Sequence, residues 1–419
     1  MEPRSASVSC TYNGANATVQ VADYLNSFSY TDVASGTSDS ISLALNDRDR
    51  KWIGPWFPQK GDRLMPSIST RNWTQAGDSS SFPCGTFCVD DFGFRGGRPI
   101  QLNLEGVALP ADSGFKATKR TETYEQTNLQ EIGQKIADRA GIALYYEAST
   151  VTIAQVEQSD QEDCEFYNEL VTKYGLALKI YNDRLVVFSE ATYEAKAAKR
   201  TLTEADFEPG WEWNTTLSGT YTGVKYEYTN AKKDETITVE VGGGDRIFTC
   251  NEAADNATEA KLIALAAVNN ANKKATTMRI TIKAIPGLIA TDCVEISGLG
   301  QLSGKYYIEK LAHNLSGSGY KMTLEIRKVE GRVSEATASP EKEAEEETPQ
   351  NELVKGGQYT LTETKKGYYT AAEALAGKAK PGNPTGVRRP GTYYIFNIAQ
   401  GMLNLSTSKT VPGSWINPN

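Results

Sequence analysis

The sequence is poor in the side chains that most enzymes use for catalysis. Its 419 residues include one histidine, His313, so a Ser–His–Asp or Cys–His arrangement would depend on this residue as its only base. Apolar and polar residues alternate around His313, which is typical of a β-strand. We therefore expect a structural role for His313 and no enzymatic activity.

Cysteines are few and scattered: Cys10, Cys84, Cys88, Cys164, Cys250 and Cys293. Cys84 and Cys88 have the spacing of half a zinc site, but no second cysteine pair or histidine cluster completes four ligands. Residues four apart on a strand point to the same face, which favours two neighbouring thiols in β-structure. We expect buried, reduced thiols and no metal.

Other binding motifs are incomplete. Asp90 and Asp91 lack the spacing of a calcium loop, and so does the acidic run at 341–347. That run is also too polar to hold two carboxylates in the fixed geometry of an acid–base pair. The glycines at 242–244 lack the lysine and the helix start of a phosphate-binding loop. We therefore expect no catalytic residue and no cofactor.

Long apolar runs and an excess of positive charge are absent as well. Residues 1–10 contain no apolar core of a signal peptide, and nowhere do about eighteen apolar residues follow one another. The 52 acidic and 44 basic side chains give a net charge of −8, which argues against a nucleic acid as the main partner. We expect a protein made in a cytoplasm, without a membrane span.

What the chain does contain, in residues 1–110, is a series of short alternating segments separated by turn residues. The clearest strand patterns are at 18–21, 40–45, 87–89 and 100–107. A chain of 419 residues is too long for one ordinary core, so several domains are expected. We interpret residues 1–110 as a small antiparallel β-barrel in a fold that is mainly β.

Helical periodicity replaces this pattern in residues 111–206, where a duplication with an offset of 34 residues appears. Each copy reads as a helix, a glycine and a strand. The helix starts are marked by two pairs with capping-box spacing, Thr127 with Gln130 and Ser159 with Glu162. The helix ends are marked by Gly141 and Gly175, which can adopt the left-handed conformation. We predict a compact α/β insertion, which makes the fold class α+β.

Strand character returns in residues 207–331, interrupted by one helix that we expect to begin near Asn256 and Glu259. Four strands are expected after it, at 276–284, 292–296, 305–309 and 320–327. We interpret residues 207–331 as a second small antiparallel β-barrel.

The remaining residues form a linker and a small module. Residues 332–352 contain prolines and an acidic run but almost no large apolar side chain, so we predict a disordered linker. Residues 353–419 carry eight basic and two acidic side chains, a net charge of +6. Thr370, Glu373 and Gly377 delimit a short helix in this basic module, and short strands follow it.

Several segments carry a resemblance to a known family. Residues 38–52, 56–64 and 84–91 read as a strand, a charged turn, an aromatic connection and a second strand, and residues 304–327 form a later strand pair. In content and order these segments resemble the two barrels of the late control protein D family, the baseplate hub of contractile phage tails and related injection machines. The resemblance implies a structural protein that turns over no substrate.

A hub of this family is a homotrimer, and its subunits together present six similar barrels. The resemblance therefore implies an adaptor between a sixfold tail tube and a threefold central spike, through which the tail contents pass. The implied partners are the tail tube protein, the central spike protein, the tape measure protein and baseplate wedge components. Such a protein is made in the cytoplasm of a host bacterium and becomes part of the baseplate of a virion or bacteriocin particle.

Subunit contacts are expected at the charged turn of the first barrel. Residues 46–51 carry five charged side chains next to two tryptophans, a combination that suits a charged rim around aromatic anchors. The predicted interface residues are Arg48, Arg50, Trp52 and Trp56. Because small barrels also use tryptophan in their cores, core packing of Trp52, Trp56 and Phe57 is the alternative.

The basic module has its own resemblance. Residues 367–377, 389–397, 401–405 and 412–418 are similar to small repeats at the ends of Gram-positive phage lysins and wall proteins, described as LysM or bacterial SH3 modules. This implies contact with peptidoglycan or teichoic acids, with docking inside the baseplate as the alternative. The candidate wall-binding residues are Tyr368, Tyr369, Arg388, Arg389, Tyr393, Tyr394 and Trp415.

A second function remains open at this point, a tail-associated cell-wall hydrolase that uses the basic module for targeting. The residues ahead of the linker contain no recognisable nucleophile, paired carboxylates or metal cluster, which argues against it.

Overall fold

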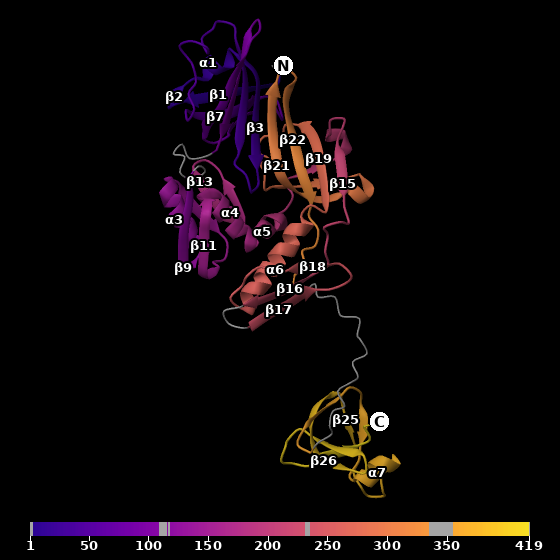
Figure 1. The fold of residues 1–419 in the computed structure, drawn as a ribbon. Helices are drawn as coiled ribbons and strands as arrows, with labels where there is room; N and C mark the ends of the chain where they lie inside the picture. The colour runs from indigo at the N-terminus through magenta and orange to yellow at the C-terminus, as the bar shows by residue number, and fades with distance from the viewer. Residues whose placement is uncertain (1–2, 109–114, 116–117, 231–234, 335–354, 419) are drawn as a thin grey trace. The chain divides into compact units, whose positions relative to one another are not determined.

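The computed structural model describes residues 3–108, 115, 118–230, 235–334 and 355–418. These residues belong to two compact units, Met1–Ser339 and Pro340–Asn419 (Figure 1). Of the predicted linker at 332–352, residues 335–352 lie outside the described residues, so its disorder stays a prediction.

One largely antiparallel sheet runs through both predicted barrels of the first unit (Figure 1). Its main path is β15-β19-β22-β21-β3-β4-β8-β7-β5-β1-β2, from which β6, β14 and β20 branch. The strands from the first predicted barrel are β1 (Ser5–Tyr12), β2 (Ala15–Asn16), β3 (Leu25–Val33), β4 (Ser40–Asp47), β5 (Arg63–Arg71), β6 (Ser79–Pro83), β7 (Phe87–Arg95) and β8 (Ile100–Val107). The others are β14 (Arg200–Leu202), β15 (Glu212–Thr215), β19 (Thr276–Lys283), β20 (Cys293–Ile296), β21 (Gly304–Ser316) and β22 (Gly319–Lys328).

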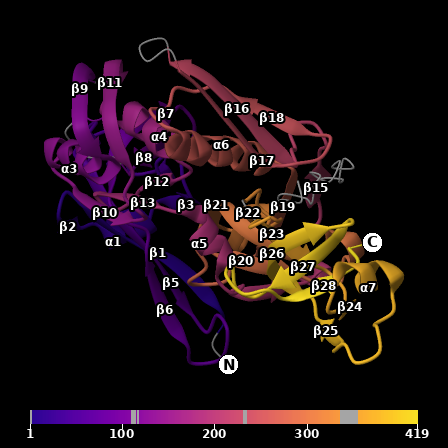
Figure 2. The same ribbon diagram turned by 90° about the horizontal axis from the view of Figure 1, so that it is seen from below.

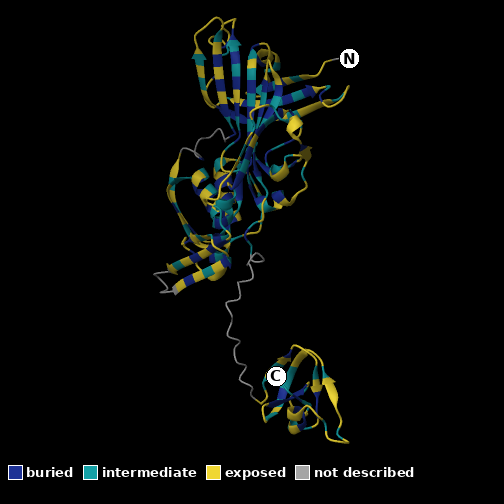
Figure 3. Ribbon diagram, turned by 90° about the vertical axis from the view of Figure 1, so that its right-hand side faces the viewer, coloured by how far each residue is buried: buried dark blue, intermediate teal, exposed yellow. Residues whose placement is uncertain are grey.

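The seam between the two sets of strands is the pairing of β3 with β21. Tyr30 lies opposite His313 and Phe28 lies opposite Leu315 in this ladder. Buried and exposed residues alternate along the strands, as the ribbon colours in Figure 3 show. The buried residues from both sets pack into one hydrophobic core. The pairing covers strand edges that each set would otherwise leave open. The predicted fold class, mainly β with helices in an insertion, is confirmed.

One predicted strand is wrong. Residues 18–21 form the helix α1 (Thr18–Ala22), with Val21 buried and Val19 65% exposed. The side chain of Asn16 accepts a hydrogen bond from the Thr18 amide, and the Thr18 hydroxyl accepts one from the Cys10 amide, which together fix a helical turn. An alternation of apolar and polar residues over only four positions fits such a helical turn as well as it fits a strand.

The predicted duplication is present, and each copy includes a further strand. The first copy is β9 (Lys119–Asn128), α3 (Leu129–Ala140) and β10 (Ala143–Glu147), and the second is β11 (Thr152–Glu162), α4 (Asp163–Lys173) and β12 (Ala177–Ile180). Strands β9 and β11 pair antiparallel with Thr123 opposite Glu157, so equivalent positions face each other. The equivalent residues Gln126 and Asp160 both have positive φ angles, 48° and 50°. The two copies are thus arranged about a local twofold axis.

Helices α3 and α4 pack closely where Gly133 meets Tyr167, two residues that are also equivalent in the duplication. A Cβ atom at position 133 would collide with the Tyr167 hydroxyl, so this contact requires glycine. Tyr167 is fully buried and donates a hydrogen bond to the carbonyl of Leu129 at 3.0 Å. Strand β13 (Arg184–Phe188) lies between β10 and β12 and completes the sheet of this region.

The helix starts differ from the predicted ones by one to a few residues. Asn128, not Thr127, caps α3 by accepting a hydrogen bond from the Glu131 amide, and Glu162 precedes α4 without a side-chain cap. The predicted cap residues Thr127 and Ser159 remain in the β9–β11 strand pair. The predicted stops are confirmed, because Gly141 and Gly175 have φ angles of 67° and 75°.

A second small sheet contains β16 (Gly223–Asn230), β17 (Glu235–Gly242) and β18 (Ile247–Cys250), and α6 (Ala257–Asn272) packs along it (Figure 2). The predicted start of α6 is confirmed by a hydrogen bond from the Glu259 amide to the side chain of Asn256. Its buried small residues pack against the duplicated region, with Ala266 next to Gly175. One core therefore contains residues from both sides of position 206. The domain boundaries at 110, 206, 331 and 352 stay predictions.

The second unit is a small β-structure with one short helix. Its strands are β23 (Gln358–Leu361), β24 (Lys365–Gly367), β25 (Gly386–Arg388), β26 (Gly391–Ala399), β27 (Met402–Ser406) and β28 (Ser414–Ile416), and its helix is α7 (Ala371–Ala376). Strands β23, β26, β27 and β28 form one sheet, whereas β24 and β25 form a separate ribbon. The predicted capping box of Thr370 and Glu373 and the stop at Gly377 are confirmed.

Candidate functional site

The predicted interface turn is folded onto the core of its own chain. Asp47 is buried at the end of β4, and its carboxylate accepts hydrogen bonds from the amides of Trp52 and Ile53 at 3.0 and 2.9 Å. These bonds direct Trp52 inward, where it is 4% exposed and part of the hydrophobic core. The expectation that Trp52 is an exposed anchor is therefore wrong, and the alternative of core packing holds for it.

The neighbouring predicted residues are more accessible. The side chain of Arg48 is 57% exposed, and its guanidinium lies 5.1 Å from the centre of the Tyr24 ring. Arg50 is exposed and has a φ angle of 56°. Trp56 is half-buried, and its ring contacts the Trp52 ring edge-on, with 5.6 Å between the ring centres. A subunit contact through Arg48, Arg50 and Trp56 stays a prediction.

An aromatic patch adjoins this turn. Phe57 is 52% exposed and packs against Phe92 and Phe94 of β7, with ring centres 5.5 and 5.7 Å apart. A cleft of about 460 Å³ next to it is lined by Tyr12, Ala15, Trp52, Pro55, Trp56, Phe57 and Asp62, among others. Sequence reasoning missed Phe92 and Phe94, although their alternation along β7 is a signal that could have found this patch.

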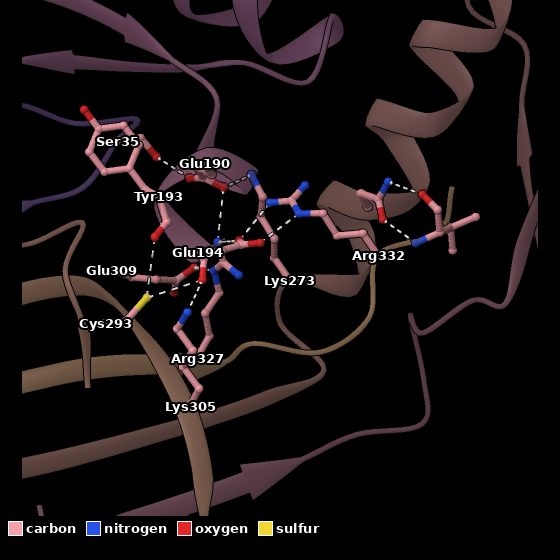
Figure 4. Close-up of polar contacts among 12 residues, drawn as sticks. Ser35, Glu190, Tyr193, Glu194, Lys273, Cys293, Lys305, Glu309, Arg327 and Arg332 are labelled. Carbon is pink, nitrogen blue, oxygen red and sulfur yellow. Dashed lines mark hydrogen bonds and ion pairs between the residues drawn. The ribbon is translucent and has the colours of Figure 1, made fainter. Parts of the chain in front are cut away.

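Two clusters of buried charge join the regions of the first unit. In the first cluster, Glu190 and Glu194 on α5 (Glu190–Ala195) bind Arg327 on β22, and all three side chains are nearly inaccessible (Figure 4). Lys273, just after α6, binds Glu190 at 2.6 Å. The Arg327 guanidinium also binds Glu309 of β21 at 2.9 Å. We call this cluster the charged joint.

The charged joint also holds the last described residues of the first unit. Arg332 makes two bonds to the carboxylate of Glu194, at 2.8 and 2.7 Å (Figure 4). Burial alone would raise the pKa of the Glu194 carboxyl. The hydrogen bonds from Arg332 and the charge of Arg327 outweigh this effect, so the pKa of Glu194 lies below its usual value. Burial instead dominates at Glu309 and raises its pKa. Sequence reasoning missed these residues, because α5 lies more than a hundred positions from Arg327 and Arg332, and such distant partners leave no local pattern.

The second cluster fastens the duplicated region to the continuous sheet through Lys179 of β12. Its ammonium group binds the buried carboxylates of Asp32 and Asp39 at 2.6 and 3.0 Å. The other Asp32 oxygen accepts a hydrogen bond from the Ala290 amide at 2.8 Å, and Asp39 accepts one from the Tyr30 hydroxyl at 2.9 Å. Burial raises the pKa of Asp39 to about 6, although the charge of Lys179 opposes this rise.

His313 belongs to the core, as expected. It is fully buried and packs against the rings of Tyr30 and Phe82, with centre distances of 5.3 and 5.2 Å, and its Nδ1 lies 2.6 Å from the Tyr320 hydroxyl oxygen. Burial lowers the pKa of His313 to about 3, which keeps the ring neutral at physiological pH. A neutral ring without solvent access is not placed to exchange protons with a substrate.

The cysteines are reduced thiols, and all but Cys164 are buried. Cys84 lies in the connection before β7 and not on a strand. The expectation that Cys84 and Cys88 share one strand face is therefore wrong. In the described parts of the chain, no three His, Cys, Asp or Glu side chains are grouped in a way that could hold a metal ion. None of the described helices is both long and apolar enough to cross a membrane.

The predicted wall-binding residues of the second unit fall into two groups. Tyr368 is 7% exposed, donates a hydrogen bond to the Gly377 carbonyl at 2.8 Å, and packs with the half-buried Trp415 in a small core. Tyr393 donates a hydrogen bond to the Arg389 carbonyl at 2.9 Å, and Tyr394 lies 5.2 Å from the Lys409 ammonium. The accessible residues are Tyr369, which is 63% exposed, and Arg389.

Arg388 is intermediate in exposure between the buried and the accessible residues. Its guanidinium lies 5.7 Å from the centre of the Tyr393 ring, and its Nε is buried without a hydrogen-bond partner among the described residues. Wall binding by these seven residues stays a prediction.

Comparisons with known proteins concern the fold. No protein-family model matches the sequence, and no curated protein matches it either. The structure is similar to the 43 kDa tail protein of prophage MuSo2 from Shewanella oneidensis, with 13% identity and a TM-score of 0.59 over 77% of this chain and 98% of that one. It is equally similar to the tail protein from Neisseria meningitidis MC58, with 12% identity and a TM-score of 0.59 over 80% and 99% of the two chains.

A more distant likeness is to a chain in the lidded PdpA–VgrG complex from Francisella, with 9% identity and a TM-score of 0.51 over 88% of this chain and 56% of that one. The chain therefore has the fold of phage tail proteins, and the tail-related part of the sequence resemblance agrees with the structure.

Proposed function

We propose that this chain is a structural tail protein whose first unit forms the baseplate hub of a contractile phage tail or tail-like bacteriocin. Two tail proteins share its fold over 98% and 99% of their own lengths, which supports a role that needs the whole fold rather than one grafted site. The described residues contain two clusters of buried charge and a partly exposed aromatic patch, features that suit assembly.

The observation that carries this proposal is the β3–β21 seam. It holds two sets of antiparallel strands in one sheet, so each subunit presents both sets in a fixed relation. Three copies around an axis would present six sets, which matches a sixfold tube, while the ring itself keeps threefold symmetry for a spike. The function is symmetry adaptation and passage of the tail contents through the ring.

The proposed partners follow from this position. They are the tail tube protein, the central spike protein, the tape measure protein and the baseplate wedge components. The protein would be made in the cytoplasm of the host bacterium and incorporated into the particle.

The experiment is electron microscopy and light scattering of the purified full chain, alone and with its spike and tube proteins. We expect a trimer that appears as a threefold ring with a central lumen. A strict monomer in every mixture would contradict the hub.

For the second unit we propose contact with the bacterial cell wall, through peptidoglycan or anionic wall polymers. The support is its net charge of +6 together with the exposed side chains of Tyr369 and Arg389. The full chain should sediment with purified Gram-positive walls, and a chain that ends at residue 334 should not. Equal sedimentation of the two chains would remove the second unit from wall binding.

The alternative of a wall hydrolase has no observation in its favour, since His313 is buried and serves the core. Zymography of the full chain on Gram-positive walls tests this alternative. A cleared band at the position of the purified chain would overturn the structural function.

A further inference from the structure

The first unit contains a cleft of about 640 Å³ between the duplicated region and the small sheet that α6 covers. We call it the edge cleft. The residues that line it include Val156 and Glu157 of β11, Phe166 and Leu170 of α4, Ala267 of α6, and Phe248 of β18. In both Figure 1 and Figure 2, β11 lies between β9 and α6, so the outer side of the β9–β11 pair is turned toward this cleft.

Two open strand edges adjoin the edge cleft. Among the described strands, β11 pairs with β9 alone and β18 pairs with β16 alone, so each keeps one edge without a neighbouring strand. Such an edge presents backbone amides and carbonyls to which an extended chain can add as a further strand. The edge cleft therefore offers a template for strand addition.

Apolar side chains from two helices form one side of the edge cleft. Phe166 and Leu170 of α4 are 4% and 6% exposed, and Ala267 of α6 is half-buried. Along β11 the half-buried Val156 packs against this core, whereas the next residue, Glu157, is exposed. A strand added here would likewise place every second side chain against the helices and the others toward solvent.

The exposed side of the edge cleft is acidic. Glu157, Glu169 and Glu252 are exposed lining residues, and none of them forms an ion pair with another described residue. Glu169 accepts a hydrogen bond from the uncharged side chain of Gln161 at 2.9 Å. Among the described lining residues Lys173 is the one cation, and its ammonium group already binds a backbone carbonyl at 3.0 Å. The charge of this surface therefore favours a basic partner.

We propose that the edge cleft binds an extended segment of a partner protein in which basic and apolar residues alternate. The segment adds as a strand at an open edge of the cleft, its apolar side chains pack on Phe166 and Leu170, and its basic side chains bind the three carboxylates. A nucleic acid or another polyanion would be repelled by these carboxylates. This inference goes beyond the proposed hub and wall contact, and it requires neither a trimer nor the second unit.

The test titrates the full chain onto a fluorescently labelled, blocked nonapeptide of alternating lysine and valine and follows the anisotropy of the label. Two control peptides are matched to it. One carries glutamate in place of lysine, and the other carries N-methyl groups on its five central residues, which removes N–H donors from both strand edges and keeps the charge. We expect saturable binding of the basic peptide, and binding of each control peptide that is about tenfold or more weaker.

Two variants of the full chain with equal loss of charge locate the site. The site variant replaces the three carboxylates of the edge cleft: Glu157→Gln, Glu169→Gln and Glu252→Gln. The control variant replaces three exposed carboxylates outside the cleft: Glu105→Gln, Glu204→Gln and Glu212→Gln. An exposed ion pair contributes about two- to fourfold in affinity, so the site variant should bind the basic peptide about 8- to 60-fold more weakly. The control variant should bind within about twofold of the unaltered chain, because its carboxylates do not contact the peptide.

Circular dichroism and the urea midpoint verify that both variants keep their fold. Equal binding of the basic and acidic peptides, or equal losses in the two variants, would overturn recognition of a basic segment by the edge cleft. Equal binding of the N-methylated peptide would overturn strand addition, and absence of saturable binding of the basic peptide would overturn the proposal as a whole. None of these results bears on the hub, which is tested by trimer formation.

Discussion

Replacement of Lys179 by methionine should release the duplicated region from the continuous sheet. This lysine is the cation bonded to Asp32 and Asp39, whose side chains are 4% and 0% exposed. Methionine keeps much of the volume and removes the charge, so two buried carboxylates lose their ion-pair partner. Breaking a buried ion pair from one side typically costs about 3–5 kcal/mol, and we expect a loss of that size in the free energy of unfolding at pH 8.

The pH dependence of this loss provides a sharper test. Burial raises the pKa of Asp39 to about 6 in the folded protein, which is above its value in the unfolded chain. Between about pH 4 and pH 6 the folded state therefore binds a proton at Asp39 more readily than the unfolded state does. The contribution of this group to stability therefore falls as the pH rises through that window. Without Lys179 the pKa of Asp39 rises further. At pH 5 Asp39 is then protonated, and the loss should shrink to about 2 kcal/mol because one of the two uncompensated charges is gone.

Urea unfolding of the full chain, followed by tryptophan fluorescence at pH 8 and pH 5, measures both values. Lys310→Met is the matched control, because Lys310 binds Glu325 at 3.5 Å in a pair whose side chains are 43% and 47% exposed. This control should lose about 0.5 kcal/mol at either pH. A loss below about 1 kcal/mol for Lys179→Met at pH 8, or an equal loss at both pH values, would refute this account of the Lys179 cluster.

Three further outcomes are expected. Gly133→Ala should lower the free energy of unfolding by about 1–3 kcal/mol, since the new methyl group collides with the Tyr167 hydroxyl, and an unchanged urea midpoint would contradict that packing. Trp52→Ala should cost about 3–5 kcal/mol through loss of core packing, whereas native stability with lost trimer formation would return Trp52 to an interface. Hydrogen bonds, first of all from the Lys380 amide, lower the pKa of Glu373 to about 2, so its contribution to stability is present above about pH 4.5 and is lost as the pH falls toward 2. The hydrogen-exchange protection of residues 371–383, measured relative to the intrinsic exchange rate at each pH, should therefore fall over that range in the unaltered chain, and Glu373→Gln should remove this fall.

Local signals in the sequence predicted most of the elements and several of their ends. The strand at 100–107, the caps at Asn256 and Thr370, and the stops at Gly141 and Gly175 depend on neighbours within a few residues, and each is confirmed. The 34-residue duplication was also visible, because equivalent residues keep similar chemistry.

Long-range packing decided the features that sequence reasoning missed. Trp52 next to five charged residues suggested an exposed anchor, but the carboxylate of Asp47 turns it into the core. The β3–β21 seam joins residues almost three hundred positions apart, and no periodic pattern in the sequence predicts such a pairing. The Lys179 cluster likewise needs three segments that are adjacent only in the folded chain.

The end of the first unit determines where a mechanical load enters it. The backbone amide and carbonyl of Val333 are both held by the side chain of Asn269 on α6, each at 2.9 Å, and Arg332 is held by Glu194. A pull that arrives along the chain from the second unit therefore meets α6 and α5 before it reaches β22. The force therefore does not separate β22 from its neighbouring strands one hydrogen bond at a time. It is distributed over the helices, the charged side chains and the sheet behind them.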